Sequence, residues 1–235
     1  MMSDHTTKAF DTDLQELNRY VAEMGGLAEK ALTDSVDALV RLDITLAKHV
    51  VSVDDAIDTL QREIEEKAIL TIARRQPMAI DLREIVSALR VANDLERVGD
   101  LAKNIAKRVA ELTSDFHPQK LIRGVEHMAA LVLAQLKQVL DAYAGRDLNR
   151  ALAVWKGDQE VDAMCTSLFR ELLTYMMEDP RNITFCIHLM FSAKNIERAG
   201  DHATNIAETV HYMIAGQPIA DARPKGDTTK LAVGH

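Results

Sequence analysis

The chain has 235 residues, and its 36 acidic and 28 basic side chains give it a formal net charge of -8. This acidic balance argues against nucleic-acid binding as its main purpose, because phosphate backbones are bound by clustered basic side chains. Hydrophobic residues make up 47 % of the chain and aromatic residues only 4 %, which predicts a folded protein with an aliphatic core and disfavours a β-sandwich or β-barrel.

Apolar and small residues recur at intervals of three and four along the first half of the chain, which is the period of an amphipathic helix. The first such stretch includes Leu17, Val21 and Met24 and stops near Leu42. The second stops before Pro77, where a helix cannot easily continue. We therefore expect helices over residues 10–42, 44–75 and 80–112.

The second half shows the same organisation, with breaks at Gly145 and at Pro180. No segment of the chain has the alternating pattern of a strand. Residues 216–235 lack helical periodicity and are predicted to form a mobile C-terminal tail. The helices of this half are expected over residues 119–143, 148–177 and 182–214.

The two halves contain a repeated segment. Asp94–Ala106 aligns with Asn195–Ala207 at an offset of 101 residues, and eight of the thirteen positions are identical. Internal duplication is the natural cause of such a match. The sequence therefore predicts an all-α fold of two tandem antiparallel three-helix bundles, one over residues 8–115 and the other over residues 116–215.

Pairs of acidic residues at i, i+4 lie on single helix faces, where like charges cost a helix about 0.2–0.5 kcal/mol per pair. Two pairs are nearly equidistant from Pro77, and two are nearly equidistant from Pro180. In an antiparallel hairpin, residues equally distant from the turn lie side by side, so each half should bring four carboxylates to one level of the bundle. The spacing decides only in part whether the two pairs also face each other, and it places them at the edge of a helix–helix seam. The eight residues are Asp54, Asp58, Glu96, Asp100, Asp158, Asp162, Glu197 and Asp201.

Clustered carboxylates without Cys or paired His favour hard metal ions that take oxygen ligands, here Mg, Mn, Fe or Ca. The alternative is a set of solvated charges neutralised by nearby basic residues. A redox di-iron centre is disfavoured, because Glu208 and His211 form the only Glu-x-x-His pair on a predicted seam. The basic residues that could neutralise the clusters are Arg62, Arg97, Lys103, Arg170 and Arg198.

Several single residues have simpler explanations. Gly99 and Gly200 each follow a cluster glutamate by three positions, and they indicate either a close approach of two helices or room for a ligand. Cys165 and Cys186 have no CxxC spacing and are expected to be buried thiols. Residues 128–134 form the longest apolar run, far too short to cross a bilayer. We expect a cytoplasmic protein that meets the membrane only through partners.

The twin segments Glu-Arg-x-Gly-Asp-x-Ala-x-Asn-Ile-Ala at 96–106 and 197–207 resemble the PhoU family of phosphate-signalling accessory proteins. The turn regions 75–83 and 176–183 are similar to that family's as well. The resemblance implies two three-helix bundles and a repeated Glu/Asp-x-x-x-Asp signature that binds multinuclear metal clusters in some members of the family. Carried onto this sequence, the signature is the eight cluster carboxylates, with Asn104 and Asn205 as candidate accessory ligands. Leu101 stands where the second copy has His202, so any role of this histidine is confined to one half.

The resemblance also implies a function without catalysis. The chain would be a negative regulator of the phosphate-starvation response that couples a high-affinity phosphate ABC transporter, through its ATPase, to a sensor histidine kinase. It also implies a homodimer. Arg97 and Arg198, which flank the clusters, are predicted to face these partners.

Two other classes of function stay open from the residues alone. A carboxylate-ligated metalloenzyme, such as a phosphohydrolase, would activate water on a two-metal site. A purely structural bundle would bind no stoichiometric metal. The apolar stripe of the third helix could complete a core shared by the two halves or form a dimer contact, and it consists of Leu82, Ile85, Val86 and Leu89.

Overall fold

The computed structural model describes residues 2–112, 119–221 and 223, and the side chains of residues 10–112, 121–221 and 223 among them. This part of the chain is helical, without any strand, and the predicted all-α class is confirmed. Its elements are α1 (Met2–Arg41), α2 (Ile44–Arg75), α3 (Ile80–Val109), α4 (Gln119–Gly145), α5 (Leu148–Glu178), the 3-10 turn η1 (Pro180–Asn182) and α6 (Ile183–Ala215).

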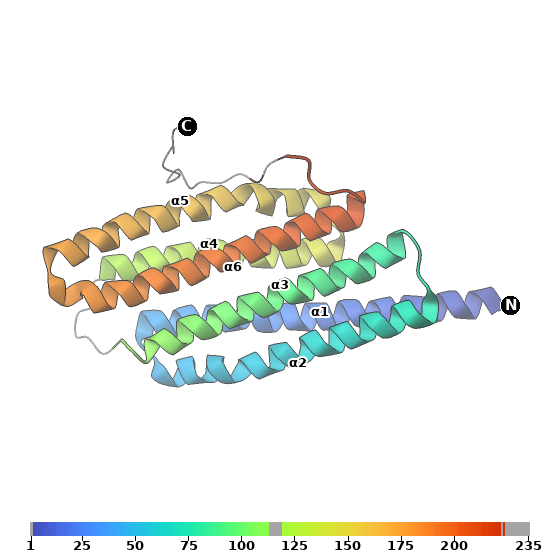
Figure 1. The fold of residues 1–235 in the computed structure, drawn as a ribbon, viewed down its shortest axis with the longest axis horizontal. Helices are drawn as coiled ribbons and strands as arrows, with labels where there is room; N and C mark the ends of the chain where they lie inside the picture. The colour runs from blue at the N-terminus through green and yellow to red at the C-terminus, as the bar shows by residue number, and fades with distance from the viewer. Residues whose placement is uncertain (1, 113–118, 222, 224–235) are drawn as a thin grey trace, which may run out of the picture.

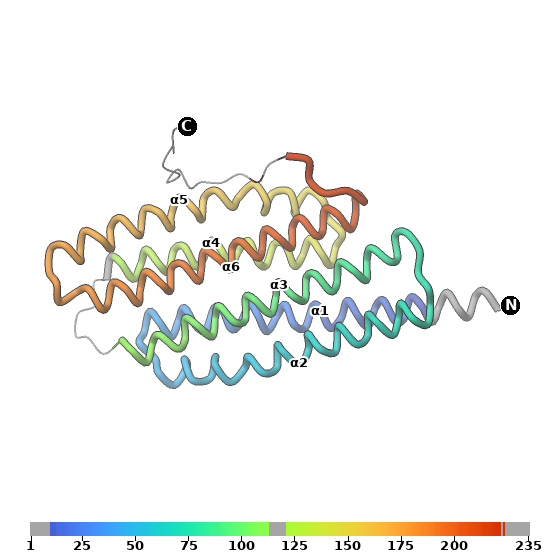
Figure 2. The backbone as a smooth tube through the Cα atoms, viewed as in Figure 1, coloured from blue at the N-terminus to red at the C-terminus, as the bar shows by residue number. Residues whose placement is uncertain are grey.

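The six helices form two antiparallel bundles that lie side by side, with α1–α3 in one and α4–α6 in the other (Figure 1). Contacts between the bundles run mainly through α3 and α6 and, to a smaller extent, through α1 and α4. The α2–α3 turn and the α5–α6 turn lie at opposite ends of the molecule (Figure 2). The tandem three-helix bundles are therefore present, and the repeated segments on α3 and α6 are neighbours at their junction.

Most helix ends lie within two residues of the predicted ones. The exceptions are α1, which begins at Met2 instead of residue 10, and α3, which ends at Val109 instead of residue 112. No Pro or Gly precedes Gly25, so the helix extends beyond its apolar stripe. At the end of α3, the amides of Glu111 and Leu112 bond to carbonyls three residues back, which tightens and closes the last turn.

The first turn of each bundle has the same construction. Leu42 and Arg146 have φ values of 53° and 50°, and an aspartate follows each of them. Asp43 accepts a hydrogen bond from the amide of Leu46 at 2.9 Å, and Asp147 caps α5 in the same way. The duplication thus extends to the helix caps.

The apolar stripe of α3 is used within the chain. Ile85 is fully buried and Leu89 packs against the core, whereas Leu82 is 38 % exposed. Ile85 and Leu89 therefore belong to the core of the chain. For these two residues, this favours a shared core over a dimer contact as the explanation of the stripe. Cys165 and Cys186 are buried thiols outside any disulfide, as predicted. No helix among the described residues has the length and hydropathy needed to cross a membrane.

A buried polar group ties the two bundles together. Glu84 of α3 is 5 % exposed, accepts a hydrogen bond from Asn18 of α1 at 3.0 Å, and pairs with Arg146. Tyr143 of α4 donates to Asn18 at 2.8 Å. A buried carboxylate needs partners of this kind, because an unpaired one is costly. The predicted boundary between the bundles, at residues 115 and 116, lies outside the described residues.

Gly99 lies where α3 packs closely against α2, and Gly200 lies where α6 packs against α4 and α5. A Cβ atom on Gly99 would lie 2.8 Å from Cδ1 of Ile57, and one on Gly200 would lie 3.3 Å from Val132 and 3.6 Å from Val161. Ile57 stands between Asp54 and Asp58 in the sequence. Close helix approach therefore explains the glycine at position 99, where a larger residue would push α3 away from the acidic face of α2.

Replacing Gly99 by valine should lower the free energy of unfolding by about 1–3 kcal/mol, because the added methyl groups overpack a closed seam. Urea unfolding followed by circular dichroism measures this change. Gly26→Val is the matched control: a Cβ atom there meets nothing within 4 Å, so this change should stay within about 0.5 kcal/mol of the wild type. Equal effects of the two substitutions would contradict the close-approach explanation.

Candidate functional site

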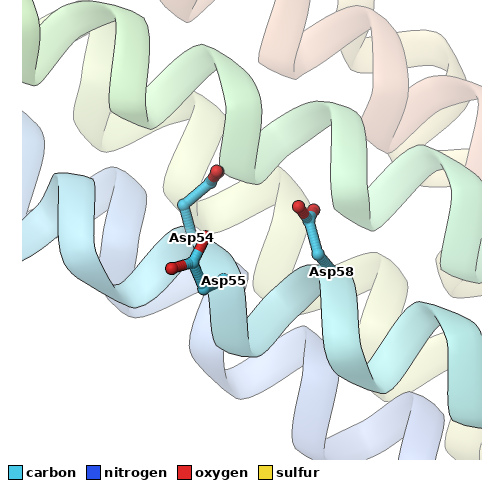
Figure 3. A group of neighbouring side chains, drawn as sticks. All are labelled: Asp54, Asp55 and Asp58. Atoms are coloured by element: carbon cyan, nitrogen blue, oxygen red, sulfur yellow. The ribbon is translucent and has the colours of Figure 1, made fainter.

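The first acidic cluster joins α2 to α3. We use this name for Asp54 and Asp58 of α2 with Glu96 and Asp100 of α3. Figure 3 shows the side chains of Asp54 and Asp58 directed towards α3. Asp54 is only 4 % exposed, and the carboxylates of Asp54, Asp55 and Asp58 offer oxygen atoms that lie within 4.8 Å of one another. The acidic pairs of α2 and α3 lie at the same level of the bundle, as their equal distances from Pro77 predict, because the Nζ atom of Lys103 contacts both Asp54 and Asp100.

A lysine from α3 neutralises the buried end of this cluster. Lys103 is hydrogen-bonded to Asp54, and its Nζ lies 3.9 Å from Oδ1 of Asp100. The hydrogen bond to Asp54 raises the pKa of Lys103 above its ordinary value, and the negative charges of Asp100 and Asp58 add to this effect. Arg97 pairs with the exposed end, at 3.3 Å from Glu96 and 3.6 Å from Asp100.

Glu96 is the member of the first cluster whose ionised form is disfavoured by its surroundings. Burial raises the pKa of its carboxyl, the neighbouring guanidinium of Arg97 opposes this rise, and the charges of Asp100, Asp58 and Asp54 add to it. The Oε2 atom of Glu96 makes no hydrogen bond among the described residues, although the Nε atom of Arg97 lies 3.3 Å from it as an ion pair.

The second acidic cluster joins α5 to α6 in the same way. We use this name for Asp158 and Asp162 of α5 with Glu197 and Asp201 of α6. Asp158 is 3 % exposed and accepts a hydrogen bond from the hydroxyl of Thr204 at 3.1 Å. Both acidic clusters therefore have one deeply buried aspartate on the second helix of the bundle.

The cation at the second cluster comes from beyond α6. Nε and Nη2 of Arg223 donate to the two carboxylate oxygens of Asp158 at 2.9 and 2.8 Å, and Nη2 also lies 2.6 Å from Asp201. Nη1 approaches Asn205 at 3.5 Å. Burial would lower the pKa of Arg223, but the hydrogen bonds to Asp158 and the nearby charges outweigh it and raise the pKa.

The other end of the second cluster opens onto a cavity. Lys194 donates to Glu197 at 2.7 Å, and burial raises the pKa of the Glu197 carboxyl although Lys194 opposes it. Asp162 and Glu197 line this cavity of about 330 Å³ together with Arg170 and apolar side chains. A charged ligand of modest size could reach Glu197 from this side.

A third polar group lies between the two repeated segments. Asp94 of α3 lies 2.8 Å from Nδ1 of His202 and accepts a hydrogen bond from Asn205 of α6 at 3.3 Å. His202 is thus hydrogen-bonded to the first repeat. Asn205 contacts Asp94 and Arg223 and lies beside the second cluster, whereas its counterpart Asn104 is exposed.

Sequence reasoning placed all eight carboxylates but missed three of their neighbours. Asp55 could have been found from its position beside Asp54. Asp94 gave no signal, because its counterpart in the repeat is Asn195. Arg223 was missed because it lies in the segment predicted to be a mobile tail. Arg97 and Arg198, predicted to face partners, are both exposed, although Arg97 also pairs with the first cluster.

The residues present fit a hard metal ion in part. Carboxylate oxygen is the donor that Mg, Mn, Ca and ferric iron prefer. Among the described residues, however, the ligand atoms that lie close enough together to hold one ion are those of Asp54, Asp55 and Asp58, and the second cluster forms no such group. Each cluster, however, already contains a basic side chain on its buried aspartate. A metal ion would therefore have to be bound by the exposed end of each cluster or displace Lys103 or Arg223.

Comparison with known proteins gives a consistent result. The PhoU domain model matches residues 21–109 and 125–210 of the chain. A Rhizobium meliloti (strain 1021) protein named phosphate-specific transport system accessory protein PhoU homolog is 58 % identical over 229 residues, covering 97 % of each chain. A Caulobacter vibrioides protein of the same name is 51 % identical over 226 residues, covering 96 % of this chain and 98 % of that protein.

Solved structures agree with these matches. The crystal structure of PhoU from Pseudomonas aeruginosa has a TM-score of 0.84 and 39 % identity, covering 88 % of this chain and all of that one. The phosphate transport system regulatory protein PhoU from Streptococcus pneumoniae has a TM-score of 0.83 and 27 % identity, covering 89 % of this chain and 99 % of that one. The names of these relatives describe accessory or regulatory proteins.

Stability should depend on pH through Glu96. Because the folded protein raises the pKa of this group, ionising Glu96 costs the folded state more than the unfolded state, and the stability present below its ordinary pKa is lost as pH rises through the raised value. Glu96→Gln should therefore gain stability relative to the wild type as the pH rises above about 4.3, the ordinary pKa of a glutamate.

Urea unfolding in chelator-treated buffer at several pH values measures this difference. Glu65→Gln, at an exposed position on α2, is the matched control, and its stability should follow that of the wild type. A difference between Glu96→Gln and the wild type that does not change with pH would show that burial of Glu96 has no effect on its ionisation.

Proposed function

The chain belongs to the PhoU family, and on that premise we propose that it is a regulatory accessory protein of a phosphate-specific transport system. The observation that supports this most is the match to relatives of that name over 97 % of both chains. A rigid pair of helical bundles with two charged clusters suits a protein that acts by docking. The names of these relatives favour an adaptor over the alternative of a metalloenzyme.

The partners in this proposal are the ATPase of the phosphate transporter and a sensor histidine kinase, through which the protein represses the phosphate-starvation response. The acidic clusters, with or without metal, would meet basic surfaces of these partners, and the exposed Arg97 and Arg198 would contact acidic residues beside them. Charge complementarity of this kind selects the partner and speeds association. The protein then reaches the membrane through the transporter.

The second part of the proposal is that both clusters bind hard metal ions. The closely spaced oxygen atoms of Asp54, Asp55 and Asp58 support it for the first cluster. The raised pKa values of Glu96 and Glu197 support it for both clusters, since a nearby cation would stabilise their ionised forms. The metal would neutralise each cluster and change the charge presented to a partner. The ligands would be the eight cluster carboxylates, with Asn205 beside the second site.

A homodimer, which the family resemblance implies, stays a prediction. The buried part of the α3 stripe belongs to the chain's own core and cannot form such a contact. Exposed apolar side chains near the α2–α3 turn can contribute to it. Met78, Ile80 and Leu82 are 81 %, 59 % and 38 % exposed.

Purified, unchelated protein should carry stoichiometric Mg, Mn, Fe or Ca by plasma mass spectrometry, and the Asp100→Asn/Asp201→Asn variant should lose it, because each substitution removes one carboxylate from a cluster. Asp34→Asn/Asp37→Asn removes the same charge from α1 and should leave the metal content unchanged. If the wild type carries no metal even after incubation with these ions, the clusters are not metal sites.

Reversing the charge of Glu96 and Asp100 to lysine should weaken binding to the purified kinase and to the transporter ATPase by at least about tenfold, roughly 1.4 kcal/mol. Surface plasmon resonance measures the affinity, and circular dichroism checks the fold. Glu65→Lys/Glu66→Lys makes the same change at exposed positions of α2 and should bind normally. Wild-type affinity of a folded Glu96→Lys/Asp100→Lys variant would refute docking through this cluster.

A further inference from the structure

A cavity of about 340 Å³ lies where the two bundles meet, and its described walls contain none of the eight cluster carboxylates. One wall is a stripe of α1, and the opposite wall is the C-terminal end of α4 with Arg146 just beyond it. Glu84 of α3 and Met213 of α6 complete the lining. A concave space of this size between packed helices, with apolar walls and a few converging polar groups, is a usual place for a small ligand.

One end of the cavity holds the buried polar group that ties the bundles together. The carboxylate of Glu84 is fixed there by Asn18, which in turn accepts a hydrogen bond from Tyr143. Burial raises the pKa of the Tyr143 hydroxyl above its ordinary value, and the charge of Glu84 adds to this rise, so the hydroxyl remains a donor. Arg146 pairs with Glu84, but its side chain is 55 % exposed. Glu84 therefore presents a fixed negative charge whose present cation reaches it from solvent.

The other end of the cavity is acidic as well. Glu29 lies three turns further along α1, about 16 Å from Asn18 by the helical rise of 1.5 Å per residue. Its carboxylate forms no ion pair or hydrogen bond within the part of the chain that the structure describes. Asp141 of α4 also lines the cavity and pairs with Arg150 at 3.6 Å. Three acidic side chains and one basic side chain thus line the cavity, a balance that favours a cationic ligand.

Gly26 keeps the middle of the cavity open. Two successive glycines, Gly25 and Gly26, interrupt α1, although glycine destabilises the interior of a helix. Packing explains Gly25, because a Cβ atom there would lie 2.9 Å from Leu140. Packing does not explain Gly26, since a Cβ atom there would meet nothing within 4 Å, and this residue lines the cavity. A glycine is expected where a ligand approaches the backbone closely.

We propose that this cavity binds a linear aliphatic polyamine, such as spermidine or spermine. One ammonium group pairs with Glu84, where it shares or replaces the contact of Arg146, and another pairs with Glu29. The methylene chain between them lies along Val21 and Leu140. Ammonium groups separated by short methylene chains match two acidic ends that are joined by apolar walls, whereas a compact cation cannot contact both ends. This inference is independent of the proposed metal binding.

A polyamine in this cavity would join the two bundles, because α1 belongs to one and α4 to the other. A ligand that binds only the folded protein raises its melting temperature, so spermidine should raise the thermal unfolding midpoint of the chain. Isothermal titration calorimetry measures the affinity directly. A chelator-treated buffer of about 150 mM salt screens the general attraction of polyamines to an acidic surface.

Spermidine should bind the wild type at one site per chain, and butylamine, which carries a single ammonium group, should bind about tenfold or more weakly. Gly26→Leu fills the cavity and should weaken spermidine binding by about tenfold or more, whereas Ala73→Leu adds the same side chain at an exposed position of α2 and should have no effect. Glu29→Gln should weaken binding by about threefold or more. Glu65→Gln, which removes the same charge from α2, should bind normally.

Circular dichroism verifies that each variant is folded. Absence of spermidine binding to the wild type would overturn the proposal, as would equal affinities for spermidine and butylamine. Wild-type affinity of folded Gly26→Leu and Glu29→Gln variants would also overturn it. If Asp100→Asn/Asp201→Asn loses spermidine binding while Gly26→Leu retains it, the polyamine binds the acidic clusters and the cavity is not its site. None of these outcomes bears on the proposed regulatory function.

Discussion

Each bundle has to accommodate four carboxylates that repel one another where two helices pack closely together. Asp54 and Asp158 are almost fully buried, and a buried carboxylate without a partner would cost several kcal/mol. A cation is therefore required at both places. Gly99 brings α3 against Ile57, beside the acidic pair of α2, so the close approach that packs this seam is also what concentrates its negative charge.

The position of the two clusters follows from the duplicated architecture. Because the repeated segments on α3 and α6 meet at the junction of the bundles, each cluster lies on a seam next to that junction. Asp94, His202 and Asn205 connect the two repeats there. A change of charge in the second cluster acts on Asn205 directly, since this residue contacts both Arg223 and Asp94. Such a connection suits a regulatory protein that carries a signal without catalysis.

Duplication produced two sites of one design, and single substitutions made them different. Where α3 has Leu101 and Lys103, α6 has His202 and Thr204. The lysine binds the first cluster from within its own helix, while the second depends on a residue beyond the end of α6. The two halves are thus alike in fold and unequal in electrostatics.

The sequence alone determined the all-α class, five of the six helices to within three residues at each end, the duplication and the pairing of all eight carboxylates. These features depend on local signals: the 3.6-residue period, the helix breakers at Pro77 and Pro180, and the equal distances of the acidic pairs from those turns. The family followed from the same repeated segments.

Only the tertiary structure decided which cations balance the clusters. Lys103 could be named among five basic candidates, but nothing local indicated that it reaches Asp54, that Asp94 binds His202, or that Arg223 returns from beyond α6 to Asp158. Local periodicity fixes which face of a helix a residue occupies. It does not fix which side chain from another helix, or from a segment without regular structure, comes to lie against that face, because this depends on how the helices pack and where the chain turns after they end.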